Sequence, residues 1–135
     1  MPEICTFDYA VIRIVPRVER EEFINAGVIV SCQKRRFLEA RSEIDARRFS
    51  AFAPHMNLIE IQKYLKTIPL ICSGDESAGA IGRLPMRARF DWLVAPRSTI
   101  IQMSPVHSGI CEDPETALEQ LLEKMVRLPK SDSEK

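Results

Sequence analysis

The segment from Phe7 to Val15 constrains the fold most, because apolar residues occupy both of the faces that an extended chain would present. Side chains alternate between the two sides of a β-strand. The two sets are Phe7, Tyr9, Val11 and Val15 on one side and Ala10, Ile12 and Ile14 on the other. A strand that is apolar on both sides is typical of the interior of a sheet. We therefore predict a central strand, which Pro16 ends because proline lacks a backbone N–H.

Further apolar runs predict the rest of a sheet. Residues 28–32 and 36–41 indicate two strands joined by the polar turn 33–36, which together form a hairpin. Residues 18–23, before this hairpin, are too few and too charged for a long helix, so we expect a helical turn or a loop there. Residues 99–103 predict one more strand, which we expect to join the same sheet.

The middle of the chain carries helix signals. Asp45 can cap a short helix over 46–53, and Asn57, with Glu60 three residues later, can cap a longer one. The apolar stripe of the longer helix would be Ile61, Leu65, Ile68 and Cys72. Pro69 should kink or split this helix, and Gly74 is typical of its C-terminal end. Residues 74–84 contain three of the five glycines and predict a flexible loop.

The clearest helix start lies near the C-terminus. Asp113 is a favourable N-cap, and Pro114 suits the first helical position. The apolar stripe of this helix would be Leu118, Leu121, Leu122, Met125 and Val126, with Pro129 ending it. These elements predict an α+β fold with an antiparallel or mixed sheet of about four strands, packed on one face against two to three helices. We expect one domain over residues 1–129 and a disordered polar tail over 130–135.

Composition indicates a cytoplasmic protein. No apolar run is long enough to cross a bilayer, and the N-terminus lacks the basic region of a signal peptide. The four cysteines are scattered, without a C-x-x-C pair, and mostly lie in apolar runs, so we expect small buried side chains and no disulfides. His55 and His107 share no recognised spacing with the cysteines, and we predict no metal site and no cofactor.

Residues 90–111 are the best candidate for a functional segment. They combine apolar runs, which we interpret as buried strand, with the only tryptophan and several polar side chains. Buried polar groups need partners. The segment therefore builds either an internal hydrogen-bond network or a ligand site.

An anion site is one interpretation of this segment. Arginine predominates among the basic residues, and its planar fork can bind phosphate or carboxylate in a bidentate manner. The candidate binding residues are Trp92, Arg97, Ser98, Thr99 and His107. In the structural alternative, Arg97 pairs with Asp91 or Glu21 and Trp92 belongs to the core. The expected members of a structural network are Glu21, Asn25, Gln102 and Ser104.

Catalytic motifs are missing from the sequence. It contains no G-x-S-x-G turn and no compact group of acidic residues. Ser104 and Ser108 lie close to His107 in sequence, but neighbours on a strand point to opposite faces. We therefore predict no catalytic residues and favour a non-enzymatic protein.

Two blocks of the sequence resemble a bacterial family of unknown function, DUF3037. They span residues 7–32 and 90–126. The shared features are Val15-Pro16, the E-R-x-E-x-x-N-x-G-V pattern from Glu19 to Val28, the A-P-R-S-T run, and S-P-V-H-S-G before D-P. The resemblance implies a small cytosolic bacterial protein and supplies no catalytic residues. Such families are often encoded beside a HipA-like kinase, so the resemblance implies a role as a protein partner or regulator of such a kinase.

Two functions follow as hypotheses. The first is a non-enzymatic protein-interaction or regulatory module in a bacterial stress, toxin–antitoxin or defence setting. The second is a domain that binds or hydrolyses a nucleotide or nucleic acid through Trp92, Arg97, Ser98 and His107. A concave pocket that unites these side chains would favour the second function, and a filled polar network would favour the first.

Overall fold

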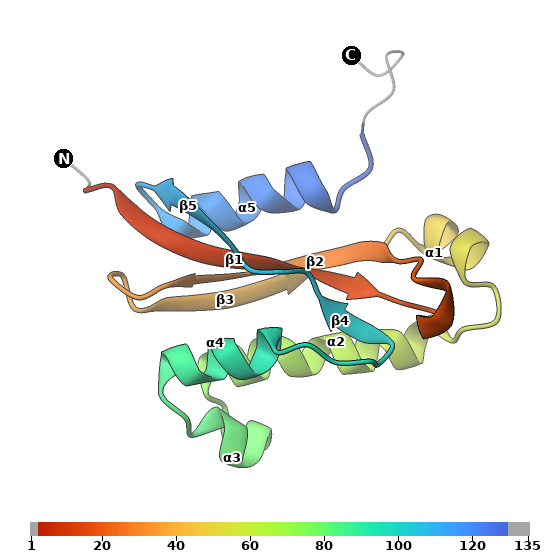
Figure 1. The fold of residues 1–135 in the computed structure, drawn as a ribbon, viewed down its shortest axis with the longest axis horizontal. Helices are drawn as coiled ribbons and strands as arrows, with labels where there is room; N and C mark the ends of the chain where they lie inside the picture. Colours follow the sequence, from red (N-terminus) through yellow and green to blue (C-terminus); the bar gives the residue numbers. More distant parts are fainter. Residues whose placement is uncertain (1–2, 130–135) are drawn as a thin grey trace.

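A five-stranded antiparallel sheet forms the centre of the protein, as the computed structural model of residues 3–129 shows (Figure 1). The strands are β1 (Cys5–Ile14), β2 (Ile24–Cys32), β3 (Phe37–Ser42), β4 (Ile101–Met103) and β5 (His107–Cys111). β2 pairs with one edge of β1 and with β3. β4 and β5 pair with the other edge of β1, β5 along its first half and β4 at its end. The predicted central strand is thus confirmed, and so is the α+β class.

Helices cover both faces of this sheet (Figure 1). One face packs against α1 (Ala46–Phe52), α2 (Leu58–Ser73) and α4 (Met86–Val94), and α3 (Gly79–Gly82) lies against α2 and α4 on the side away from the sheet. The other face packs against α5 (Pro114–Met125). Two short 3₁₀ helices, η1 (Val18–Arg20) and η2 (Glu76–Ala78), complete the chain. The expectation of helices on one face only was wrong, because β1 and β2 are apolar on both sides and each side needs a cover.

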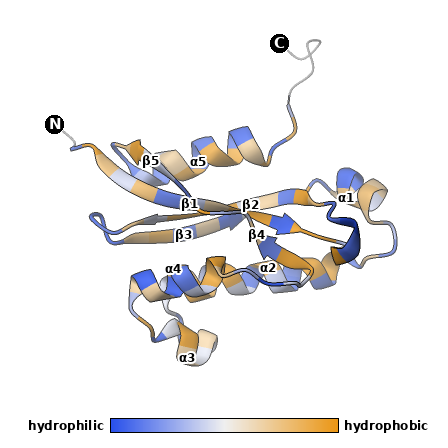
Figure 2. Ribbon diagram, in the orientation of Figure 1, coloured by the Kyte–Doolittle hydropathy of each residue, from blue (hydrophilic) through white to orange (hydrophobic). Residues whose placement is uncertain are grey.

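Two hydrophobic cores result, one on each face of the sheet (Figure 2). Beneath α2 and α4, the fully buried side chains include Ile12, Ile14, Ile29, Phe49 and Phe90. Beneath α5, they include Val28, Val30, Cys32, Leu118 and Leu122. Met125, expected in the buried stripe of α5, is instead partly exposed. Within residues 3–129, no helix is both long and apolar enough to span a membrane.

The caps predicted at Asp45, Asn57 and Gly74 are confirmed, whereas Asp113 precedes α5 without a capping bond from its side chain. Asn57 Oδ1 accepts hydrogen bonds from the N–H groups of Ile59 (2.9 Å) and Glu60 (3.3 Å). Gly74 ends α2 in the left-handed region at φ 71°, which glycine adopts without steric cost. Pro69 does not split α2, which continues to Ser73. Pro69 lies on the exposed side of α2, while Ile68, Ile71 and Cys72 are packed in the core. Burial of these three side chains stabilises the helix past the proline.

Residues 74–111 depart most from expectation. The predicted loop over 74–84 contains η2 and α3, and Phe90 to Val94, interpreted as strand, forms the last turns of α4. Phe90 and Leu93 are both buried, and their spacing of three is that of one helix face. β5 was not predicted, and Gly109 lies within it, where the ring of Phe7 fills the space that a Cβ of residue 109 would occupy. The tail predicted over 130–135 lies outside the described residues.

Candidate functional site

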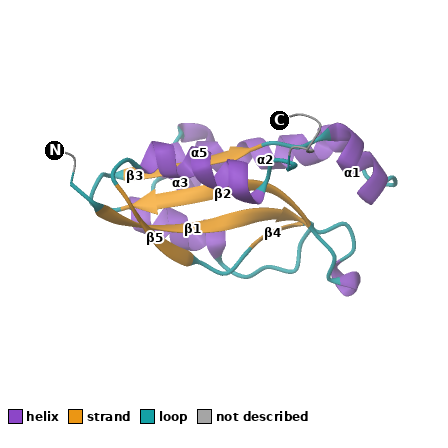
Figure 3. Cartoon of the chain, turned by 90° about the horizontal axis from the view of Figure 1, so that it is seen from above, coloured by secondary structure: helices purple, strands orange, loops and turns teal. Residues whose placement is uncertain are grey.

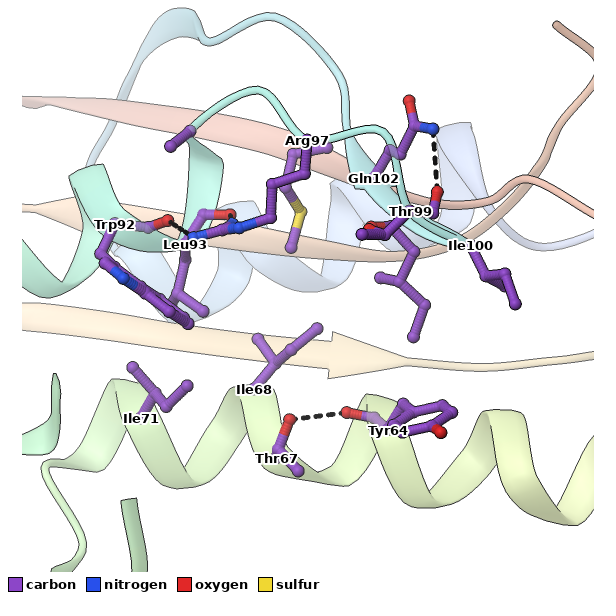
Figure 4. Close-up of a pocket in the computed structure, with 13 residues that line it drawn as sticks. Tyr64, Thr67, Ile68, Ile71, Trp92, Leu93, Arg97, Thr99, Ile100 and Gln102 are labelled. Carbon is purple, nitrogen blue, oxygen red and sulfur yellow. Dashed lines mark hydrogen bonds between the residues drawn. The ribbon is translucent and has the colours of Figure 1, made fainter. Parts of the chain in front are cut away.

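An apolar cavity of about 340 Å³ opens between α2, the end of α4, and the segment that leads into β4 (Figure 4). We call it the α2–α4 pocket. Its wall residues are Tyr64, Thr67, Ile68, Ile71, Trp92, Leu93, Ala95, Arg97, Thr99, Ile100, Ile101, Gln102 and Met103. Most are apolar, and Arg97 is the only charged side chain among them. A cavity of this size falls at the lower end of the range of pockets that bind small molecules, about 300–1,000 Å³.

One face of α2 forms the floor of the pocket. Tyr64, Thr67, Ile68 and Ile71 follow the i, i+3, i+4, i+7 spacing that places side chains together on a helix. Ile68 and Ile71 are buried in the core beneath, whereas Tyr64 stands at the rim with 55% of its surface exposed. The same helix face therefore contributes Ile68 and Ile71 to the core and Tyr64 to the rim of the pocket.

Arg97 and Trp92 form the opposite wall. The guanidinium of Arg97 lies over the indole ring, with its Cζ atom 4.3 Å from the ring centroid. Arg97 also donates hydrogen bonds from Nη1 to the carbonyl of Leu93 (3.1 Å) and from Nη2 to that of Trp92 (2.6 Å). These carbonyls belong to the last turn of α4, where no further helical N–H is available. Arg97 therefore closes the C-terminal end of α4. Within residues 3–129 it pairs with neither Asp91 nor Glu21, the two partners that the structural alternative considered, and Asp91 pairs with Arg87 instead (3.2 Å).

Thr99 and Gln102 hold the segment before β4 in place. Thr99 Oγ1 donates to the carbonyl of Ile101 (2.7 Å), and Gln102 Nε2 donates to the carbonyl of Thr99 (2.8 Å). Both bonds are local, and both residues line the pocket. Their polar groups are therefore used to shape the wall.

The structure brings only some of the candidate residues together. Trp92, Arg97, Thr99 and Gln102 share the α2–α4 pocket, but Ser98 does not line it and His107 lies on β5. The ring of His107 packs beside that of Tyr9, with centroids 5.5 Å apart. The α2–α4 pocket therefore does not unite all of the residues that the anion hypothesis requires.

The residues proposed as a structural network also lie apart. Ser104 is buried, and its Oγ accepts from the N–H of Val11 (2.8 Å) and donates to the carbonyl of Pro105 (2.9 Å). Asn25 donates from Nδ2 to the carbonyl of Met125 at the end of α5 (2.9 Å). Glu21 ends η1 with a positive φ of 58°. Ser104 and Asn25 thus have separate partners, and these residues do not form one network.

A polar cluster that sequence reasoning missed joins β1, β5 and α4. Asp8 Oδ1 accepts from Ser108 Oγ (2.7 Å), and Asp8 Oδ2 accepts from Arg87 Nη1 (2.6 Å). The Ser108 hydroxyl, followed by the Arg87 guanidinium, holds the pKa of Asp8 below its ordinary value. Both oxygens are thus engaged, so Asp8 is not a free general base. Only the register that places Asp8 opposite Ser108 reveals the cluster.

Three of the four cysteines meet beneath α5. Cys5 Sγ lies 3.4 Å from Cys32 Sγ and 3.7 Å from Cys111 Sγ, and all four cysteines are free thiols. Burial raises the pKa of Cys111 to about 11 and that of Cys72 to about 12. Because the thiolate is the reactive form, these thiols are poor nucleophiles near neutral pH.

Comparison with known proteins places the chain in a family. No curated protein and no solved structure matches it. The family described as a protein of unknown function, DUF3037, matches residues 9–126, a range that includes every residue of the α2–α4 pocket. The match covers most of the sequence, and the chain belongs to the DUF3037 family.

Proposed function

We propose that the protein is a non-enzymatic interaction module that binds a segment of a partner protein in the α2–α4 pocket. The observation that carries this proposal is the apolar character of the pocket together with its exposed apolar rim. Tyr64, Trp92 and Ile100 all line the pocket and are 55%, 39% and 40% exposed. Clustered exposed apolar side chains mark interaction surfaces, and tyrosine and tryptophan are enriched in them.

The lining indicates the chemistry of the partner segment. The cavity can accept one large apolar side chain, aromatic or aliphatic, against Ile68, Ile71 and Leu93. Arg97 contributes a positive charge at the wall, and no carboxylate lines the pocket within residues 3–129. We therefore expect an apolar anchor residue followed or preceded by Asp or Glu.

The donors of Arg97 argue against the nucleotide alternative. A phosphate bound in a bidentate manner by Nη1 and Nη2 would compete with the carbonyls of Leu93 and Trp92, which these two nitrogens already contact. Breaking those bonds would leave the last turn of α4 without partners. The aromatic face of Trp92 could stack on a base, but Arg97 already covers one side of it.

The family resemblance adds a setting to this proposal. A HipA-like kinase is the first candidate partner, in a bacterial stress, toxin–antitoxin or defence context. The support for that partner is the resemblance alone. The geometry of the pocket supports the more general statement, which is binding of an apolar anchor on a protein segment.

A peptide-display selection tests the proposal. Purified protein is used to select from a random peptide library, and enriched peptides are titrated while the fluorescence of Trp92, the only tryptophan, is followed. We expect a consensus with one large apolar residue beside an acidic one, and a spectral shift on binding. Tyr64→Ala should weaken binding at least about tenfold, because rim aromatics are typical hot spots.

Control variants distinguish binding in the pocket from nonspecific hydrophobic binding. Ile59 is also exposed on α2 but does not line the pocket, so Ile59→Ala should bind like the wild type. Equal binding by the Tyr64→Ala variant would contradict the proposal. Saturable binding of ATP, GTP or single-stranded oligonucleotides at low salt, in place of peptides, would favour the second hypothesis.

A further inference from the structure

We infer that the outer edge of β5 pairs with β5 of a second copy of this chain, forming a two-fold antiparallel dimer. This surface is distinct from the α2–α4 pocket, and the inference does not depend on the proposed function. Figure 3 shows β5 at the border of the sheet, beyond β1. β2 and β5 pair with opposite edges of β1. β5 uses one of its own edges to pair with β1, and no strand within residues 3–129 pairs with the other edge of β5.

The edge of β5 lacks the protection that sheet edges usually carry. Monomeric proteins block exposed edges with charged residues, prolines or bulges. β5 reads His107-Ser-Gly-Ile-Cys111, with no lysine, no acidic residue and no proline, and its register with β1 is regular. Ile110 is 71% exposed, more than any other large apolar side chain in the described part of the chain.

The hydrogen-bond alternation of the sheet fixes which groups are free. On the edge of β1 that meets β4 and β5, the N–H of Val15 donates to the carbonyl of Ile100, and the carbonyl of Val11 accepts from the N–H of Ser104. The backbone N–H and C=O groups of the odd-numbered residues of β1 therefore point to that edge. Tyr9, Phe7 and Cys5 face His107, Gly109 and Cys111 in the β1–β5 register. The backbone groups of the alternate residues, Ser108 and Ile110, therefore point outward.

This pattern is self-complementary about Gly109. If two β5 strands meet antiparallel with Gly109 opposite Gly109, Ser108 of each copy faces Ile110 of the other. The outward N–H and C=O groups of both residues are then all paired between the copies. Gly109 falls at the pair where the two backbones approach most closely, about 4.5 Å between Cα atoms, and it has no side chain to obstruct that approach.

The side chains of the two faces match the same register. On the face toward α4, the two exposed Ile110 side chains become diagonal neighbours and cover each other. On the α5 face, a groove of about 410 Å³ lies beside the strand, and its wall includes Cys111, Glu112 and Asp113. The second copy places His107 opposite Cys111, beside this groove, whose wall also carries Lys124. A second copy thus pairs the outward backbone groups and covers the exposed apolar side chain in one contact.

Oligomeric state tests this inference. Sedimentation or light scattering of the full chain, from micromolar to submillimolar concentration, should show a rise from the monomer mass of 15.4 kDa to twice that value. Ile110→Lys adds an edge charge at an exposed position and should leave a folded monomer over the whole range. The matched control Ile59→Lys, at a similarly exposed position on α2, should dimerise like the wild type.

Amide hydrogen exchange gives a readout that needs no variant. The N–H groups of Ser108 and Ile110 should exchange slowly at high concentration and faster on dilution. Those of His107 and Gly109, bonded to β1, should stay protected at both concentrations. A wild-type chain that remains monomeric throughout, an Ile110→Lys variant that still dimerises, or Ser108 and Ile110 amides with concentration-independent exchange would each overturn the inference.

Discussion

Arg97 stacks on Trp92 and, at the same time, bonds to the carbonyl oxygen of that residue. The guanidinium therefore serves two purposes: it completes the last turn of α4 and it builds one wall of the α2–α4 pocket. An arginine that the sequence offered as a phosphate ligand is engaged by backbone. The consequence is that its planar fork matters for structure, and substitutions at this position test that directly.

Arg97→Lys should destabilise the protein by about 1 kcal/mol, because an ammonium cannot bond to both carbonyls in the same planar geometry. The measurement is the urea midpoint at constant m-value. The emission of Trp92 should shift as well, since the lysine would not cover the indole in the same way. Arg17→Lys, at an exposed position with no bond from its side chain among those described, is the matched control. An unchanged midpoint for Arg97→Lys would contradict the capping role.

Ser104→Ala should cost about 1–3 kcal/mol, because the buried N–H of Val11 would lose its acceptor. Ser98 is exposed and lies in the same segment, so Ser98→Ala should change the free energy of unfolding by less than about 0.5 kcal/mol. Thermal or urea unfolding of both variants checks the difference. A Ser104→Ala variant whose free energy of unfolding changes as little as that of Ser98→Ala would show that the Ser104 hydroxyl is not needed for stability.

The first three strands and the helix starts at Asn57 and Asp113 were predictable from the sequence because their signals are local. Both apolar faces of β1, the Asn57 cap and the Asp113-Pro114 start each depend on a few neighbouring residues, and each appears where expected. The second apolar face of β1 also needs a cover, and α5 provides it. The sequence therefore contained a signal for helices on both faces of the sheet, although helices were predicted on one face only.

The candidate site was harder to predict because its contacts depend on tertiary structure. Trp92 and Arg97 were identified as residues of interest, but their wall becomes a pocket only opposite Tyr64 and Ile68, which lie 24 to 33 residues earlier in the chain. The pairing of Asp8 with Ser108 spans the β1–β5 register, and β5 itself was hidden by Gly109. Buried partners of this kind leave no periodic trace in the sequence.

Cys72 should make the protein lose stability at alkaline pH. Burial raises the pKa of its thiol to about 12, against the opposing influence of Arg89. An unfolded chain ionises this thiol at its lower ordinary pKa, while the native state keeps it neutral. The stabilisation is therefore complete below the ordinary pKa and is lost as the pH rises toward about 12. Unfolding free energies measured across this range should fall less steeply in Cys72→Ala than in the wild type; parallel curves would rule out the contribution.

Asp8 should confer stability that is lost in acid. The Ser108 hydroxyl and then the Arg87 guanidinium lower the pKa of its carboxyl in the native state, while the unfolded chain keeps the ordinary value. The stabilisation is present above that ordinary value and disappears as the pH falls through the lowered one, because protonation removes the charge that both donors favour.

Ser108→Ala tests this acid dependence without changing the carboxylate. It removes the hydroxyl that has the largest effect on the pKa of Asp8 and keeps the ion pair with Arg87. The native pKa of Asp8, followed by carboxyl carbon chemical shifts, should rise toward its ordinary value, and the loss of unfolding free energy in acid should become shallower. Ser98→Ala, which touches no part of this cluster, should titrate like the wild type. If Asp8 titrated identically with and without the Ser108 hydroxyl, the cross-strand bond between β1 and β5 would not be what lowers its pKa.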